Sequence, residues 1–385
     1  MHRRRGVAVA LVAAALLAVP SASASRFLQH GIFDDAQILY GNPDVVFPTL
    51  KTLRTKLIRV DLVWGGANGV AKRRPANAAN PNDRAYDWSL YDRTVNYAAQ
   101  YGIKVMFSIV GTPPWANGAA GLNVKPRNPL DLQQFAAAAA RRYSGTFAAP
   151  DGRQLPAVRY WLAWNEPNNP AFLRPQYRKI GGRWVPQSPI DYAKICNAVY
   201  KGVSVTTLGA SKVACGVTGP RGNNQPGSAR PSLAPLAFLR GMKKAGATKF
   251  DAYAHHPYYG KPIETPSTPP PPGKHGNEPT AVTLGNIGIL IKEVTRLYGN
   301  KRIWVTEYGY QTKPPDPIFG VSLANQARYV TQSYAIMKKN PRIDMMLWFL
   351  LRDERRARLE EGWQSGFLTE TGARKPSFAA FQKLR

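Results

Sequence analysis

The chain has 385 residues, of which 52 are lysine or arginine and 23 are aspartate or glutamate, so its formal net charge is +29. This length exceeds that of most single domains but suits an α/β barrel with insertions. A protein this basic is attracted to polyanions such as nucleic acid, anionic lipid or acidic polysaccharide. However, its basic residues occur singly and in pairs, and no nucleic-acid-binding motif is present. This pattern favours an arginine-rich surface without a nucleic-acid partner.

The N-terminus has the pattern of a secretory signal peptide over residues 1–24. Arginines follow the first residues, residues 6–19 are apolar, and Ala22-Ser23-Ala24 offers small residues for cleavage. The apolar run is too short for a permanent membrane helix, and no later stretch is long and apolar enough. We therefore expect residues 25–385 to be secreted, either extracellular or associated with the cell wall, without a membrane span.

Apolar strands and amphipathic helices alternate about eight times after the signal. The expected strands are 29–33, 56–64, 103–110, 158–164, 213–217, 250–255, 302–308 and 343–350. The expected helices are 43–52, 88–100, 130–143, 191–205, 233–245, 284–298, 323–338 and 377–384. No linker divides two cores and no internal repeat occurs. The pattern predicts one α/β domain, a (β/α)₈ TIM barrel.

Loop lengths support a barrel independently. The connections from each helix to the next strand are short. Those from each strand to the next helix are long: 65–84, 168–189, 219–232, 257–283, 311–322 and 351–376. A TIM barrel builds its active site from the strand-to-helix loops, so the elaborated loops lie where a site is expected.

Two of the predicted strands end in a glutamate. Glu166 closes one strand, where Pro167 cannot donate to a sheet, and Glu307 closes another just before Gly309. Two strand-end carboxylates far apart in sequence are what a glycoside-cleaving pair requires. The alternative is two unrelated surface glutamates at strand ends.

These motifs resemble those of clan A glycoside hydrolases, the retaining β-glycosidases built on (β/α)₈ barrels. In that clan the fourth strand ends in Asn-Glu and the seventh in a nucleophilic glutamate, which look like Asn165-Glu166 and Glu307. The resemblance extends to Arg59 on the second strand, to His256-Pro257-Tyr258 after the sixth and to Trp348 at the eighth. It covers essentially all of residues 25–385 and implies a retaining mechanism.

Family 39 is the closest match within the clan. Trp-Asn-Glu-Pro at 164–167, together with Thr-Pro-Pro-Trp at 112–115, looks most like that family. Family 5 is the near alternative. The histidine that family 5 members often carry after the third strand is not evident, because Thr-Pro-Pro-Trp stands there.

The resemblance implies a role for each member of the catalytic group. Glu307 would attack as the ionised nucleophile, with Arg59 and Tyr258 stabilising its charge. Glu166 would be the general acid/base, its pKa raised by burial and by the negative charge of Glu307. Alternatively, Arg59 is an ordinary arginine at the edge of the sheet.

Other residues at the strand ends are candidate sugar contacts. Asn165 would donate to the hydroxyl beside the anomeric centre, and His256 would orient Glu166 or hold a hydroxyl. Trp348 would form the aromatic platform under the sugar, and Trp115 would extend the groove. Further possible contacts are Trp64, Tyr310 and Asp61. We expect His255, on the other face of its strand, to be structural.

Cysteine usage and ligand spacing exclude some chemistry. Cys196 falls in a predicted helix and Cys215 in the next strand, so we expect two buried thiols, with a disulfide as the alternative. No Cys/His cluster has metal-ligand spacing, so we expect neither a metal nor another cofactor.

The sequence therefore predicts a monomeric, exported, retaining glycosidase acting on an oligo- or polysaccharide, with an anionic glycan as one option. A carbohydrate-binding barrel without turnover is the alternative. A metal-dependent barrel hydrolase is a third class, which the missing ligand clusters disfavour.

Overall fold

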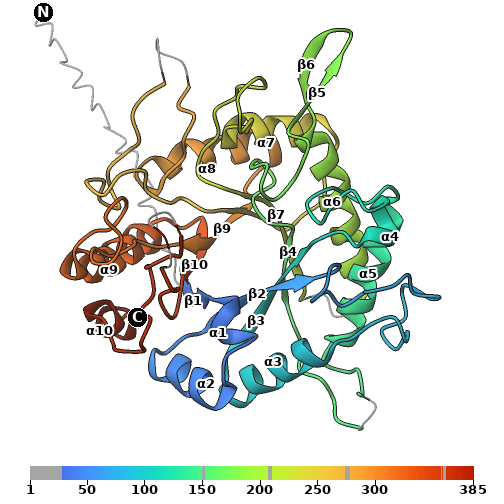
Figure 1. The fold of residues 1–385 in the computed structure, drawn as a ribbon, viewed down its shortest axis with the longest axis horizontal. Helices are drawn as coiled ribbons and strands as arrows, with labels where there is room; N and C mark the ends of the chain where they lie inside the picture. Colours follow the sequence, from blue (N-terminus) through green and yellow to red (C-terminus); the bar gives the residue numbers. More distant parts are fainter. Residues whose placement is uncertain (1–27, 150–151, 207–209, 274–277, 357, 359–360) are drawn as a thin grey trace, which may run out of the picture.

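The structure is a computed structural model that describes residues 28–149, 152–206, 210–273, 278–356, 358 and 361–385. These residues form a closed parallel barrel with the strand order β1-β10-β9-β8-β7-β4-β3-β2 (Figure 1). The barrel strands are β1 (Gln29–Phe33), β2 (Leu57–Val63), β3 (Lys104–Val110), β4 (Tyr160–Ala163), β7 (Lys212–Thr218), β8 (Ala252–His255), β9 (Arg302–Tyr308) and β10 (Ile343–Phe349). The predicted (β/α)₈ barrel is confirmed. The expected signal peptide, residues 1–24, lies outside the described residues.

Helices surround the barrel on its outer side (Figure 1). They are α1 (Asp35–Ile38), α2 (Pro43–Thr52), α3 (Ser89–Gln100), α4 (Pro114–Asn117), α5 (Pro129–Arg142), α6 (Ser188–Val203), α7 (Pro235–Lys244), α8 (Ile287–Tyr298), α9 (Leu323–Lys339) and α10 (Pro376–Gln382), with a 3-10 turn, η2 (Leu284–Asn286), before α8. In α8 the buried residues Ile287, Leu290 and Val294 recur at helical spacing, so one face packs inward. No described helix has the length and apolarity that crossing a membrane requires.

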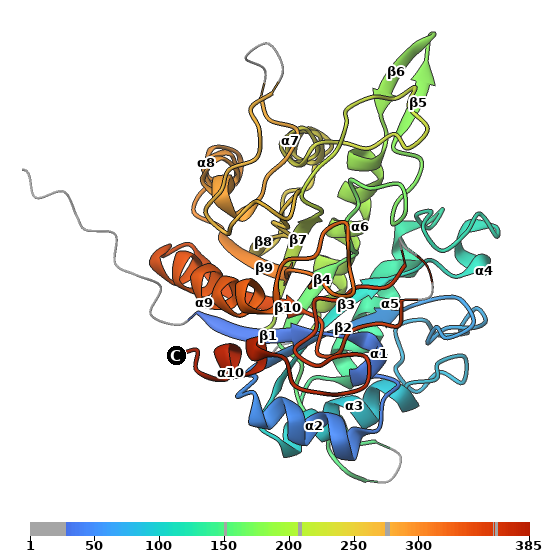
Figure 2. The ribbon, with the colours of Figure 1, turned by 60° about the vertical axis from the view of Figure 1, so that its left-hand side comes forward.

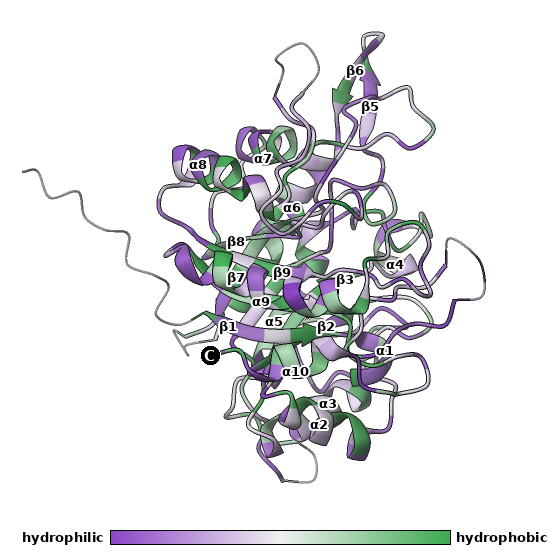
Figure 3. Ribbon diagram, turned by 90° about the vertical axis from the view of Figure 1, so that its left-hand side faces the viewer, coloured by the Kyte–Doolittle hydropathy of each residue, from purple (hydrophilic) through white to green (hydrophobic). Residues whose placement is uncertain are grey.

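The core has two layers, one inside the barrel and one between the barrel and the helices. Side chains alternate between them along each strand, because successive residues of a strand point to opposite faces. On β10, Met345 and Leu347 belong to the inner cluster, whereas Met346 and Trp348 belong to the outer one. Hydrophobic residues accordingly concentrate in the barrel strands, and hydrophilic ones are spread over the helices and loops (Figure 3).

The long connections follow the carboxyl ends of the strands, as predicted. The connection after β4 carries a small antiparallel hairpin, β5 (Tyr177–Ile180) and β6 (Arg183–Pro186), which extends away from the barrel (Figure 2). This arrangement gathers the elaborated loops around one mouth of the barrel, where both strand-end glutamates also lie.

The expectation for the two cysteines is wrong. Cys196 on α6 and Cys215 on β7 form a disulfide, with their Cα atoms 5.8 Å apart. Both cysteines are fully buried where α6 packs on β7. The distance is therefore inside the range that a disulfide tolerates, which the layer spacing assumed from the sequence did not allow.

Candidate active site

Glu166 is delivered by a sharp turn after β4. Trp164 and Glu166 both have left-handed backbone angles, with φ of 73° and 33°. Such conformations cost about 1–3 kcal/mol each in non-glycine residues and persist where surrounding contacts fix them. Here the Ser108 hydroxyl donates to the Trp164 carbonyl at 2.9 Å, and the Trp164 indole donates to the Phe172 carbonyl at 2.7 Å. The turn therefore holds the Glu166 carboxyl in the mouth of the barrel.

Glu307 lies at the end of β9, where its two carboxylate oxygens have separate partners. Arg59 on β2 donates from Nη1 to Oε1 at 2.8 Å, and the Tyr258 hydroxyl donates to Oε2 at 3.1 Å. The Arg59 side chain is fully buried and its guanidinium packs on the Phe33 ring. A buried arginine requires such an anionic partner, so Arg59 belongs to the site and is not a surface residue.

Arg59 also orients Asn165. Its Nη2 lies 2.9 Å from Asn165 Oδ1 and 3.2 Å from an oxygen of Asp61. Because a guanidinium only donates hydrogen bonds, Asn165 must turn its oxygen toward Arg59. The Asn165 amide N–H groups are then left for another acceptor, such as a sugar hydroxyl.

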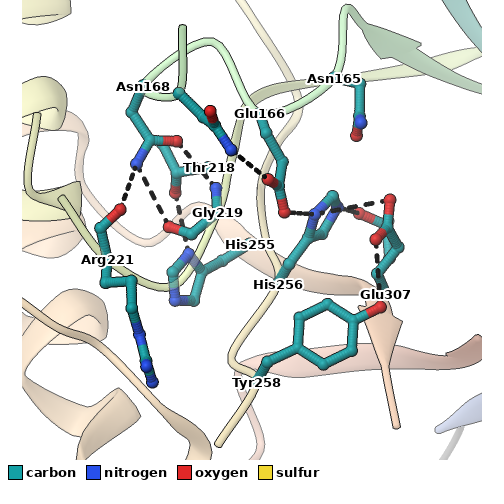
Figure 4. A network of polar contacts seen from close by, with 12 residues as sticks. Asn165, Glu166, Asn168, Thr218, Gly219, Arg221, His255, His256, Tyr258 and Glu307 are labelled. Carbon is teal, nitrogen blue, oxygen red and sulfur yellow. Dashed lines mark hydrogen bonds and ion pairs between the residues drawn. The ribbon is translucent and has the colours of Figure 1, made fainter. Parts of the chain in front are cut away.

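His256 connects the two glutamates (Figure 4). Its Nδ1 lies 2.9 Å from Glu166 Oε1, and its Nε2 lies 3.3 Å from Arg59 Nη1 and 3.0 Å from the Thr306 hydroxyl. Burial lowers the pKa of His256 to about 4, so the imidazole is neutral at neutral pH. Since Arg59 can only donate, Nε2 is the accepting nitrogen, and Nδ1–H donates to Glu166.

The two carboxyl groups are close together but have different partners. An oxygen of Glu166 and one of Glu307 lie within 4.8 Å of each other. Burial raises the pKa of Glu166 to about 7, against a weak hydrogen bond from Asn169 and the charge of Arg59. Burial also raises the pKa of Glu307, while the charge of Arg59 lowers it. Only Glu307 touches a cation directly, so the arrangement favours an ionised Glu307 beside a protonated Glu166.

The same group offers ligand atoms for a cation. Among the described residues, Glu166, His256 and Glu307 each provide one atom within 4.8 Å of the others. Arg59 already supplies a positive charge 2.8 Å from Glu307 and would repel a second cation there. The expected absence of a metal remains a prediction.

The prediction of Trp348 as the sugar platform is wrong. Its side chain is fully buried on the outer face of β10, where it stacks on Phe367 and donates from Nε1 to the Ser365 carbonyl. Strand alternation explains the error, because the residue that faces the barrel interior is the next one, Phe349. Phe349 packs on Phe33 and on Trp363, whose side chain is 40% exposed.

Other predicted contacts are away from the glutamates. Trp115 is half-buried, packs edge-on against the buried Trp64, and donates to the Ala71 carbonyl. Tyr310 is buried and donates to the Glu264 carbonyl. In the described part of the chain, the hydrogen bonds and ring contacts of these aromatic residues go to partners other than the two glutamates.

His255 is structural, as expected. Its Nε2 lies 2.9 Å from the Val282 carbonyl, and its Nδ1 lies 2.8 Å from the Thr218 hydroxyl. Both ring nitrogens are therefore occupied on the outer side of β8, and burial lowers the pKa of this histidine to about 3.

Several residues of the site were missed at the level of sequence. Asn169 lies 3.4 Å from Glu166 Oε2, and Asn168 accepts from the Gly219 N–H at 2.8 Å (Figure 4). The Glu166 carboxyl rests on Gly219, where an added Cβ would lie 2.8 Å from it, so a side chain there would displace the acid. The run Asn165-Glu166-Pro167-Asn168-Asn169 contained the signal, since amides beside a strand-end carboxylate can position it. No comparable sequence signal pointed to Trp363, because this residue stands deep in a long loop.

Comparison with known proteins adds a sequence match and a set of similar folds. A family model described as "Glycosyl hydrolase catalytic core" matches residues 282–380. A family 39 glycoside hydrolase from Bacteroides cellulosilyticus WH2 has a TM-score of 0.62 and 19% identity, over 93% of this chain and 63% of that one. A glucosidase from Croceicoccus marinus has a TM-score of 0.64 and 15% identity, over 94% of this chain and 67% of that one. A monomeric β-xylosidase from Caulobacter crescentus CB15 has a TM-score of 0.60 and 16% identity, over 94% of this chain and 69% of that one. The chain thus spans less than two thirds of the first of these proteins. No curated protein matches it by sequence.

The closed barrel and the catalytic-core model matched over residues 282–380 show that this chain has a fold like that of glycoside hydrolases. Family 39 enzymes, which the sequence motifs resemble, are among the proteins with a similar fold. The identities of 15–19% to the three structures described above establish the fold and not the substrate.

Proposed function

We propose that this protein is an exported, retaining β-glycosidase that hydrolyses O-glycosidic bonds of an oligo- or polysaccharide through a covalent glycosyl-enzyme. The observation that carries the proposal is the pair Glu166 and Glu307, whose oxygens lie within 4.8 Å of each other in unlike environments. Retaining enzymes hold their two carboxyl groups about 5–5.5 Å apart, whereas inverting enzymes leave about 6.5–9.5 Å for a water molecule.

In the first step, an ionised Glu307 attacks the anomeric carbon. The bond to the leaving oxygen breaks as Glu166 transfers its proton to that oxygen, so no alkoxide has to leave. Arg59 and Tyr258 hold the attacking carboxylate in place by both of its oxygens. The amide of Asn165 is oriented to donate to the neighbouring sugar hydroxyl, a bond that strengthens as positive charge develops on the sugar ring.

In the second step, Glu166 works as a base. It is now a carboxylate, and the Nδ1–H of His256 stabilises that charge from 2.9 Å. Glu166 removes a proton from water, the water oxygen attacks the anomeric carbon, and Glu307 leaves as a carboxylate. The product has the configuration of the substrate, and both glutamates return to their starting protonation states.

The sugar platform that we propose in place of Trp348 is formed by Phe349 and Trp363. The Trp363 ring lies 5.6 Å from both the Phe349 and the Tyr258 rings, and Tyr258 is the residue that contacts Glu307. An exposed aromatic face beside the nucleophile suits the apolar C–H face of a sugar ring.

Product stereochemistry tests the proposal. A panel of 4-nitrophenyl β-glycosides is incubated with the protein, and the first-formed sugar is followed by ¹H NMR before it mutarotates. We expect the β-anomer to appear first. Initial release of the α-anomer would contradict a retaining mechanism, and the absence of hydrolysis on this panel and on wall polysaccharides would contradict the function itself.

Export and the monomeric state are separate parts of the proposal. The basic, apolar and small-residue pattern of residues 1–24 supports export. Expression with its own N-terminus, followed by mass spectrometry of the culture medium, should recover a chain that begins near residue 25. Light scattering of that material should give the mass of one chain.

A further inference from the structure

A cleft of about 520 Å³ opens beside Glu166, between the loops that follow β4, β7 and β8. Its polar lining includes Asn169 from the first loop, Arg221 and Arg230 from the second, and Lys261 and Glu264 from the third. In Figure 4, Arg221 lies on one side of Glu166 and Glu307 lies on the other. The cleft is therefore on the acid side of the glutamate pair.

Asn169 joins this cleft to the proposed chemistry. Its amide lies 3.4 Å from Glu166 Oε2, and the same residue lines the cleft. A general acid must reach the oxygen of the leaving group, so the leaving part of the substrate extends past Glu166 on the side away from the nucleophile. That path leads into the cleft.

The cleft carries three cations against one carboxylate. Arg221, Arg230 and Lys261 make no ion pair and no side-chain hydrogen bond with a described residue. The carboxylate of Glu264 accepts a hydrogen bond from the Gly260 N–H at 2.6 Å. It attracts Arg221 electrostatically but forms no hydrogen bond with it. By contrast, Arg240 on the helical shell is paired with two glutamates. Positive charge without local partners is thus concentrated beside the general acid.

Arg221 is positioned although it has no ionic partner. Its guanidinium lies over Gly260, where an added Cβ would come within 2.6 Å of Nη2 and 2.8 Å of Nη1. Its carbonyl accepts from Asn168, the residue that also binds the Gly219 backbone under Glu166. The Arg221 backbone is therefore anchored near Glu166, and its guanidinium packs against Gly260 without an ionic partner among the described residues.

We propose that this cleft is a leaving-group subsite that binds a sugar unit carrying an anionic group, a carboxylate or a sulfate. The proposal rests on the proposed function, because the direction of the leaving group follows from the role of Glu166. A planar, unpaired guanidinium offers two parallel donors to either anion, and the two neighbouring cations add attraction without fixing geometry. An acidic oligo- or polysaccharide is then the substrate class.

Binding tests this subsite apart from turnover. The wild-type protein and two triple variants are run at 150 mM salt in native gels that contain polygalacturonate, alginate, hyaluronan, their carboxyl-reduced forms, or chondroitin sulfate. The first variant is R221Q/R230Q/K261Q. The second, R54Q/K201Q/K292Q, removes three exposed cations from the opposite end of the barrel and from α6 and α8, so it matches the change in net charge. Melting temperatures confirm folding, and R221Q alone replaces the first triple if that variant does not fold.

We expect at least one acidic glycan to bind the wild-type protein about tenfold more tightly than its carboxyl-reduced form. The variant R221Q/R230Q/K261Q should lose this tenfold preference, and the charge-matched variant R54Q/K201Q/K292Q should keep it to within twofold. Retardation by chondroitin sulfate alone identifies sulfate as the anionic group. Equal losses in the two triple variants would show attraction by bulk charge and overturn the proposal, as would the absence both of a preference for a carboxylate form and of retardation by chondroitin sulfate. Hydrolysis of 4-nitrophenyl glycosides by both triples shows separately whether the proposed function holds.

Discussion

The two glutamates of the site differ in how the chain holds them. Glu307 ends a regular strand and is fixed by a cation and a phenol through Arg59 and Tyr258. Glu166 sits in a left-handed turn and is contacted by neutral groups, the imidazole of His256 and the amide of Asn169. Burial does not distinguish the two side chains, which are 13% and 9% exposed for Glu166 and Glu307.

The two glutamates thus differ in the charge of the groups that contact them and not in depth, and this difference separates the proposed acid from the proposed nucleophile. Two equally buried carboxyl groups close together cannot both ionise cheaply. The one that touches the guanidinium takes the negative charge, and the one among neutral donors keeps the proton.

Glu307→Gln should have the largest effect. The amide keeps the shape of the side chain but cannot attack, so kcat on 4-nitrophenyl glycosides should fall by about 10⁴-fold or more. Thermal melting should show that the fold is retained. Activity above about 1% of wild type, after exclusion of contaminating enzyme, would remove Glu307 from the nucleophile position.

Glu166→Ala should come next and depend on the leaving group. Hydrolysis of a natural glycan should fall by about 10²–10⁴-fold, whereas cleavage of a nitrophenyl glycoside, whose leaving group needs no proton, should stall at the glycosyl-enzyme. Azide attacks without a general base and should restore turnover, giving the β-glycosyl azide. Glu307→Ala should give the α-azide instead. An α-azide from the Glu166 variant would mean that the two roles are reversed.

Arg59→Lys should weaken the distinction between the glutamates. An ammonium cannot span Glu307 and Asn165 with two fixed donors, so we expect kcat/KM to fall by about 10²-fold. Without the guanidinium, the pKa of Glu307 should rise, and the acid limb of the pH–rate profile should move to higher pH. A uniform loss with an unchanged profile would indicate only a packing defect.

The pH profile should report Glu166 on its alkaline side. The acid form is the active one in the first step, and burial raises the pKa of Glu166 to about 7, so kcat/KM should decline as the pH rises through that region. The Asn169 amide stabilises the carboxylate and thereby lowers this pKa. Asn169→Ala should shift the alkaline limb to higher pH, and a shift to lower pH would show that the amide favours the protonated acid.

The smallest expected effect is a pH-dependent difference in thermal stability between the Glu166→Gln variant and the wild-type protein. The folded pKa of about 7 lies above the reference value of 4.5, so the folded state binds more protons than the unfolded state between these pH values. The wild-type protein therefore loses stability as the pH rises through this window. The neutral amide avoids that loss, so its melting temperature should exceed that of wild type by a few degrees at pH 8 and match it near pH 4. The same difference at both pH values would refute the linkage.

The fold and the glutamate pair could be predicted because their signals are local. The spacing of apolar residues marks each strand and helix, and position at a strand end places Glu166 and Glu307 at one mouth of a barrel. Arg59 and Tyr258 contact Glu307 as the family resemblance implied.

The predictions that were wrong or missing depend on how strands, helices and loops are placed relative to one another. The choice between Trp348 and Phe349 requires the inside–outside phase of β10, which an almost uninterrupted apolar strand does not reveal. The disulfide depends on how closely α6 approaches β7, and this distance follows from packing that no single segment encodes. Trp363 reaches the site through the path of a long loop, for which the sequence gives no geometric rule.

The Cys196–Cys215 bridge has a mechanical consequence for the cleft beside Glu166. The helix at the end of the first cleft loop and the strand at the start of the second are covalently joined. Nearer the site, Asn168 ties the same two loops together again. Two walls of the cleft are thus tied to each other by a covalent bond and by hydrogen bonds. We expect the third wall, the loop that carries Lys261 and Glu264, to be the one that adjusts the width of the cleft to a bulkier substrate.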